Sequence, residues 1–182
     1  MKWRLVMARN VEIKARVADP RDLESRAREI ADEGPFDLAQ DDTFFTCARG
    51  RLKLRELAPE RGELIFYRRE DKTGPKVSEY SIVATSNPAE LRAMLSNALG
   101  VIGRVRKRRR LYLAGNTRIH LDEVEGLGSF LELEVVLSGS QTVADAEAVA
   151  QSLMRELGIP RSSLIQGAYL DLIEEQDGGF RA

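Results

Sequence analysis

Apolar and polar residues alternate along most of this chain, which is the pattern of β-strands whose two faces meet different surroundings. The clearest example is Arg51-Leu52-Lys53-Leu54-Arg55, in which the leucines share one face and the cations share the other. Strands are predicted over residues 11–17, 43–48, 51–57, 63–69, 77–84, 101–113, 117–125, 130–137 and 168–172. Short turns such as Arg49-Gly50 and Arg61-Gly62 favour hairpins over parallel crossovers.

Three segments have the helical period instead. The first begins at Asp19-Pro20, where an acid caps the helix and proline takes the first helical position, and Gly34-Pro35 ends it. The second begins in the same way at Asn87-Pro88, and the third covers residues 142–157. Together these elements predict an α+β protein, in which a mostly antiparallel sheet is long enough to close and helices pack outside it.

No break in composition divides the chain. We therefore expect residues 1–182 to form one domain with a core over about 9–173, and a frayed tail over 174–182.

Several predicted strands carry charged side chains on one face. The sets that share a face are Asn10, Glu12 and Lys14; Lys53 and Arg55; Lys107 and Arg109; Arg118, His120 and Asp122; and Glu132 and Glu134. One interpretation is an open sheet with a wet face. The other is a closed sheet, whose apolar outer faces pack against the helices and whose charged faces look inward. Such an interior needs water, metal ions or a polyanionic ligand, because buried charges cannot stay unpaired.

A triphosphate bound with a divalent cation meets that need. It carries about four negative charges, and arginine forks match the geometry of its oxygens. Carboxylates repel phosphate, but they hold Mg²⁺ or Mn²⁺, which in turn bridges phosphate oxygens. A mixture of cations and clustered acids therefore indicates a metal–phosphate site rather than a simple anion pocket.

Composition narrows the setting of the protein. The 182 residues are 43% hydrophobic and 31% charged, yet the formal net charge is only −1, which argues against a general nucleic-acid coat. The single cysteine, Cys47, cannot form an internal disulfide. No apolar run is as long as a membrane span, and the first residues do not form a secretory signal. We expect a cytoplasmic protein that binds neither membranes nor nucleic acid.

A series of motifs follows in order over residues 9–172. The motifs are Asn10-Val11-Glu12-Ile13-Lys14, Gln40-Asp41-Asp42-Thr43-Phe44-Phe45, Gly50-Arg51-Leu52-Lys53-Leu54-Arg55, Tyr67-Arg68-Arg69, Val105-Arg106-Lys107-Arg108-Arg109, Thr117-Arg118-Ile119-His120-Leu121-Asp122-Glu123-Val124, Gly126-Leu127-Gly128 and Phe130-Leu131-Glu132-Leu133-Glu134. This series resembles the CYTH, or triphosphate tunnel, superfamily of class IV adenylate cyclases, thiamine triphosphatases and inorganic triphosphatases. The pattern is most similar to the class IV cyclase-like branch.

The resemblance implies a closed eight-stranded antiparallel tunnel with a defined set of ligand-binding residues. It implies phosphate contacts for Lys14, Lys53, Arg55, Arg69, Lys107, Arg109 and Arg118, of which Lys14, Arg55, Arg109 and Arg118 would also be catalytic. It implies Mg²⁺ or Mn²⁺ ligands at Glu12, Glu132 and Glu134, with Asp122 as a further acidic candidate. Asn10 stands where the family signature has its first glutamate, which would reduce metal affinity or the number of bound metals.

Three hypotheses for function remain at this stage. A triphosphatase would direct water at the terminal phosphorus, whereas a cyclase would direct a ribose hydroxyl at the α-phosphorus. The third is a non-catalytic module that binds nucleotide or polyphosphate. His120, the only histidine, is interpreted as a structural hydrogen-bonding residue, with a general acid or base as the alternative. The assembly is expected to be a monomer or a homodimer.

Overall fold

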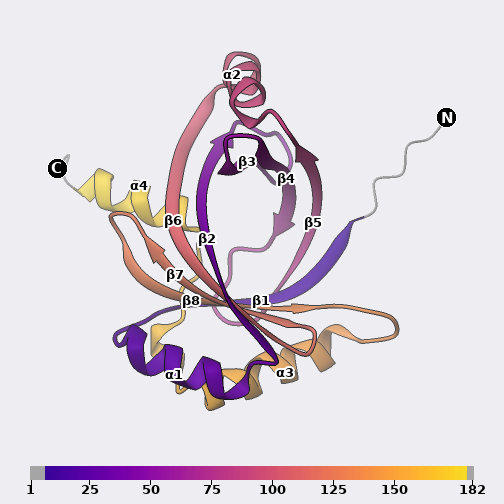
Figure 1. Ribbon diagram of the computed structural model, residues 1–182, viewed down its shortest axis with the longest axis vertical. Coiled ribbons are helices and arrows are strands. Elements are labelled where there is room, and N and C mark those ends of the chain that lie inside the picture. The colour runs from indigo at the N-terminus through magenta and orange to yellow at the C-terminus, as the bar shows by residue number, and fades with distance from the viewer. Residues whose placement is uncertain (1–6, 180–182) are drawn as a thin grey trace.

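The computed structural model describes residues 7–179, which form a closed antiparallel β-barrel surrounded by helices (Figure 1). The strands are β1 (Ala8–Arg16), β2 (Glu33–Phe45), β3 (Arg51–Ala58), β4 (Arg61–Arg69), β5 (Lys76–Thr85), β6 (Val101–Ala114), β7 (Thr117–Val124) and β8 (Gly128–Val136). Around the barrel they follow the order β1-β5-β4-β3-β2-β6-β7-β8, and β8 pairs with β1 to close it. The predicted α+β barrel of eight antiparallel strands is therefore confirmed.

In the described part of the chain, four α-helices lie outside the barrel. They are α1 (Pro20–Ile30), α2 (Pro88–Leu99), α3 (Val143–Glu156) and α4 (Tyr169–Gly179). The Asp19 carboxylate accepts hydrogen bonds from the first turn of α1, and Thr142 and Asp145 form a reciprocal capping box at α3. Figure 1 shows α1 and α3 together beneath the β1, β7 and β8 wall, α2 at the opposite end of the view and α4 beside β6.

The main hydrophobic core lies between the barrel's outer wall and the helices. Val11 and Ile13 of β1, with Leu131 and Leu133 of β8, are fully buried and pack against α1 and α3. Since side chains alternate along each strand, packing these apolar residues outward turns their neighbours Glu12, Lys14 and Glu132 inward. The position of the core thus determines which face of each strand lines the tunnel.

A second apolar cluster covers one end of the barrel. Phe44, Val105 and Phe130 point into it from the strands, and Tyr169 and Leu170 of α4 complete it. The Lys76 ammonium, which is fully buried, donates 2.7 Å to the carbonyl of Gln166, just before α4. The C-terminal segment is therefore attached across this end of the tunnel.

Two local predictions were wrong. Residues 168–172, predicted as a strand, belong mostly to α4, which runs to Gly179. Of the residues 174–182 that were expected to form a frayed tail, residues 180–182 lie outside the described part. Strand β2 begins at Glu33, well before the predicted start at residue 43. On α2, the apolar side chain of Met94 is 60% exposed. Between residues 7 and 179, none of the helices combines the length and the hydropathy needed to span a membrane.

Candidate active site

The barrel encloses a cavity of about 400 Å³ whose wall carries many charged side chains beside apolar ones. Its cationic lining residues are Lys14, Lys53, Arg55, Arg69, Lys107, Arg109 and Arg118, and its acidic ones are Glu12, Asp42, Glu63, Glu132 and Glu134. The second interpretation of the charged faces, an inward-facing lumen, is therefore confirmed. The cations expected to contact phosphate and three of the four expected metal ligands share this one space.

Two buried aspartates hold four of the cations. Asp42 of β2 lies opposite Arg55 of β3 and accepts from Arg55 Nε at 2.8 Å, Arg55 Nη2 at 2.9 Å and Lys53 Nζ at 2.7 Å. Asp122 of β7 lies opposite Arg109 of β6 and accepts from Arg109 Nε and Nη2, both at 2.7 Å, and from Lys107 Nζ at 2.9 Å. Each carboxylate therefore fixes one lysine and one arginine.

These contacts shift the pKa values of both partners. Burial alone would raise the pKa of Asp42, but Arg55 and Lys53 outweigh it and hold that pKa below its ordinary value. The pKa of Asp122 is lowered in the same way by Arg109 and Lys107. Burial and the neighbouring Arg109 lower the pKa of Lys107 to about 8 in spite of Asp122. Both aspartates are therefore ionised at neutral pH.

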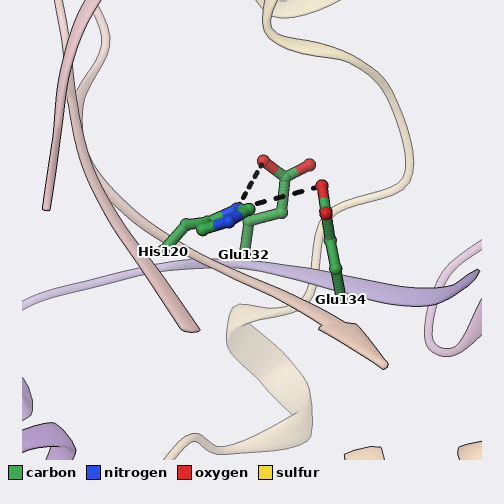
Figure 2. Close-up of side chains that lie close together, drawn as sticks. All are labelled: His120, Glu132 and Glu134. Atoms are coloured by element: carbon green, nitrogen blue, oxygen red, sulfur yellow. Dashed lines mark ion pairs between the residues drawn. The ribbon is translucent and has the colours of Figure 1, made fainter. Parts of the chain in front are cut away.

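A compact group of possible metal ligands lies on the β7 and β8 wall (Figure 2). His120, Glu132 and Glu134 point toward one another, and each offers one ligand atom within 4.8 Å of the others. The Nδ1 atom of His120 is 3.8 Å from Glu132 and 3.9 Å from Glu134, and it has no hydrogen-bond partner within residues 7–179. Burial and Arg109 lower the pKa of His120, which keeps the imidazole neutral, the form that ligates metals.

Glu12 borders this acidic group from the neighbouring strand. It lies opposite Glu134 in the β1–β8 pairing, and Arg69 Nη1 donates to its Oε1. Burial and the Glu132 carboxylate raise the pKa of Glu12, even though Arg69 and Lys14 act in the opposite direction. A raised carboxyl pKa among buried acids indicates negative charge that a cation would relieve.

The remaining cations connect the two regions. The Lys14 ammonium is 3.6 Å from Glu132 and 3.9 Å from the centre of the Tyr169 ring. Arg118 donates 3.3 Å to Glu134. Arg109 Nη2 donates 2.5 Å to Glu132 as well as to Asp122. The cationic and acidic parts thus form one continuous network, so a ligand bound to one part lies beside the other.

The two ends of the tunnel are formed by different parts of the chain. Ala168 and Tyr169 line the end that α4 covers. By the strand register, the other end is lined by apolar residues, Leu38, Leu57, Ile82 and Leu111, and Ile82 is 48% exposed there. This second end is where a group attached to a polyphosphate would meet apolar surface.

The surroundings of two residues bear on the roles that were expected of them. Asp122 was expected as a metal ligand, but its oxygens accept from Lys107, Arg109 and the Tyr169 hydroxyl, and it lies outside the His120 group. His120 was interpreted as a hydrogen-bonding residue, and the two carboxylates that face its ring add the role of a metal ligand as a second interpretation. Its parity with Arg118 and Asp122 indicated the tunnel, but the sequence could not place it beside β8.

Sequence reasoning also missed several tunnel residues. Asp42 was part of a motif without an assigned role, and Tyr169 was placed on a strand. The Asn10 Oδ1 and Gln40 Oε1 atoms are buried and lack hydrogen-bond partners within the described residues, so both remain available to a ligand. The alternation in Gln40-Asp41-Asp42 could have indicated that Gln40 and Asp42 share the inner face.

Fold and interior together define a β-tunnel protein with a charged lumen. The chain belongs to the CYTH domain family, whose sequence pattern its residues 8–169 match. A Methanocaldococcus jannaschii protein named "putative adenylate cyclase" is 25% identical over 175 residues, which cover 89% of this chain and 97% of that relative.

Solved structures share the fold. The PH1012 protein of Pyrococcus horikoshii superposes with a TM-score of 0.79 at 23% identity, covering 90% of this chain and 98% of that chain. HpAC1 from Hippeastrum, for which a dominant triphosphatase activity is described, superposes with a TM-score of 0.59 at 18% identity, covering 87% and 91%. These likenesses extend the tunnel architecture across archaeal and plant proteins.

Proposed function

We propose that this chain is a divalent-metal-dependent enzyme that acts on a triphosphate bound in its tunnel. The observation that carries the proposal is the shared lining of one cavity of about 400 Å³ by seven cationic side chains and an acidic group beside them. The cations suit phosphate oxygens, while the acids suit a metal that bridges those oxygens. A site for a simple anion would not need the second component.

The cationic wall would bind and orient the triphosphate. Arg55 and Arg109 line the cavity, and their aspartates leave Nη1 unused, while Lys14 and Arg118 approach from the acidic side. Fixed donors of this kind neutralise charge that develops on phosphate oxygens and need no reorganisation during the reaction. These four residues are the catalytic candidates.

The acidic group fits Mg²⁺ or Mn²⁺. Glu132, Glu134 and His120 would hold the ion, with Glu12 and the Asn10 amide oxygen beside them. An ion bound there would polarise the phosphoryl group and lower the barrier to attack on phosphorus. Replacement of the signature's first glutamate by Asn10 leaves an uncharged oxygen available at this position.

The reaction itself has two candidates. The relative from M. jannaschii supports adenylate cyclase activity, and HpAC1 supports hydrolysis of a triphosphate. The apolar end formed by Leu38, Leu57, Ile82 and Leu111 offers surface to an organic group, which supports a nucleoside or thiamine triphosphate over the inorganic compound. The non-catalytic module remains the alternative if turnover is absent.

A substrate panel tests the proposal. The purified protein is incubated with ATP, tripolyphosphate or thiamine triphosphate, each with Mg²⁺ or Mn²⁺. Cyclic AMP with pyrophosphate identifies a cyclase, orthophosphate release identifies a triphosphatase, and binding without turnover identifies a binding module.

A variant pair tests the metal site. Glu132→Ala is expected to abolish metal-dependent turnover, whereas Glu29→Ala, an exposed acid on α1, retains wild-type turnover. A wild-type rate in Glu132→Ala would exclude Glu132 as an essential ligand.

A further inference from the structure

Asp42 and Asp122 build the same arrangement of atoms twice. In both cases Oδ1 accepts from arginine Nε, and Oδ2 accepts from arginine Nη2 and from the Nζ of the lysine two residues earlier. In both cases the aspartate lies directly opposite the arginine on the neighbouring strand. We call each set a clamp: Asp42 with Lys53 and Arg55, and Asp122 with Lys107 and Arg109.

The two clamps are not a sequence repeat. Asp42 precedes its cations along the chain and Asp122 follows its own, so the order of aspartate and cations is reversed. Only the pairing of β2 with β3, and of β6 with β7, makes them equivalent. Because β2 also pairs with β6, the strands that carry the cations, β3 and β6, are two strand spacings apart, roughly 10 Å. The register places Val105 level with Arg55, so Arg109 lies four residues further along β6. The cations of the two clamps therefore reach the lumen from neighbouring parts of one wall.

A buried aspartate beside the cations of an anion site weakens the attraction of that site for anions. Its presence in both clamps therefore needs another explanation. The explanation is that the aspartate fixes the geometry of the cations. The bidentate carboxylate holds the guanidinium plane and the lysine in place, and it leaves arginine Nη1 unused. Side chains that are already fixed lose less conformational entropy on binding. The aspartates would thus reduce the net positive charge of the site but hold its cations in the geometry that binds phosphate.

We propose that Asp42 and Asp122 are positioning residues, and that each clamp presents its lysine–arginine pair to a separate phosphoryl group of one polyphosphate. The proposal rests on the proposed triphosphate binding. It gives Asp122 a role through Lys107 and Arg109 instead of through a metal. Neither aspartate touches the ligand in this scheme.

The sign of a binding change separates positioning from simple charge balance. Asp42→Asn and Asp122→Asn keep the side-chain shape but each adds one unit of positive charge to the tunnel. If only charge mattered, tripolyphosphate would bind more tightly. Positioning predicts weaker binding by about tenfold or more for each variant, because hydrogen bonds between charged groups are lost.

Calorimetry with inorganic tripolyphosphate and no metal gives this readout independently of turnover. Asp41→Asn is the matched control, since Asp41 is the next residue on β2, faces outward and binds Arg104 and Arg106. Its affinity is expected to stay within about twofold of wild type. Thermal unfolding of every variant confirms that the folded protein is measured.

Glutamate variants provide a second arm with charge unchanged. Asp42→Glu and Asp122→Glu keep the negative charge but move the carboxylate by one methylene, so positioning again predicts weaker binding. Wild-type or tighter affinity in the folded variants would overturn the inference, as would an equal loss in Asp41→Asn. Failure of the wild-type protein itself to bind tripolyphosphate would remove the proposed function and this inference together.

The assignment of separate phosphoryl groups has its own test. If each clamp holds a different group, the fold-changes of Asp42→Glu and Asp122→Glu multiply in the double variant. A double variant that binds no more weakly than either single variant would overturn this part of the proposal.

Discussion

The Tyr169 hydroxyl contributes to stability through one buried contact, and Tyr169→Phe removes that contact alone. The hydroxyl donates 3.0 Å to Asp122 Oδ2, and both residues are almost completely buried. The phenylalanine ring retains the edge contact with Phe130, at 5.0 Å between centroids, and the position over the Lys14 ammonium. Any change in stability therefore reports on the hydroxyl.

The expected loss follows from the acceptor's charge. A hydrogen bond to a charged group contributes about 1.5–3 kcal/mol. Asp122 keeps its bonds to Lys107 and Arg109 in the variant, so we expect the lower part of that range, about 1.5–2 kcal/mol. For a chain of this length, that corresponds to a fall of roughly 3–8 °C in the unfolding midpoint.

Urea unfolding at neutral pH, followed by circular dichroism, measures this loss. Tyr112→Phe is the control, because its hydroxyl is 3.2 Å from Glu24, whose side chain is 23% exposed. That variant is expected to lose less than about 1 kcal/mol. A Tyr169→Phe protein as stable as wild type would refute the argument that the Tyr169 hydroxyl stabilises the fold through its bond to Asp122.

Three further predictions concern other parts of the fold. The folded-state pKa of Asp42 lies below its ordinary value of 3.8, so the ionised carboxylate stabilises the fold above pH 3.8 and this stabilisation is lost as the pH falls below it. Asp42→Asn should therefore flatten the acidic part of the curve of unfolding free energy against pH. Gly103→Ala should destabilise the protein by about 1–3 kcal/mol in urea unfolding, because the new Cβ would lie 2.3 Å from Leu170 Cδ1. In a Leu170→Ala background, which is itself destabilised by the loss of a buried leucine, the same change at Gly103 should cost less. Asp41→Asn should cost less than about 1 kcal/mol in the same assay, since its arginine partners are partly exposed.

The inner face of the barrel was predictable because it depends on parity. Where apolar residues such as Val11 and Ile13 are packed outward, their neighbours must face the lumen, and the sequence alone states which residues are neighbours. The first half of β2 escaped prediction because most of residues 33–39 are exposed, so no buried face imposes an alternation.

The wrong assignment of residues 168–172 has a local cause. A short apolar run such as residues 168–172 does not distinguish strand from helix. The signal that favours the helix is Asp171, whose carboxylate accepts from the backbone amide of Ala168.

Contacts between distant segments could not be derived from position along the chain. The Tyr169–Asp122 contact joins residues 47 positions apart, and His120 meets Glu132 only through the β7–β8 register. Such pairings follow from closure of the barrel. The strand pattern indicates closure, but it does not give the register in which the strands pair.

The outward position of the main hydrophobic core constrains how a tunnel of this kind can vary. Each strand serves the core with one set of alternate residues and the lumen with the other, so inserting or deleting one residue inside a strand would exchange the two sets downstream. Leucines would then enter the lumen while lysines and glutamates met the helices. Differences in length between such proteins are therefore expected in turns and helices, and changes in ligand preference are expected to occur by substitution.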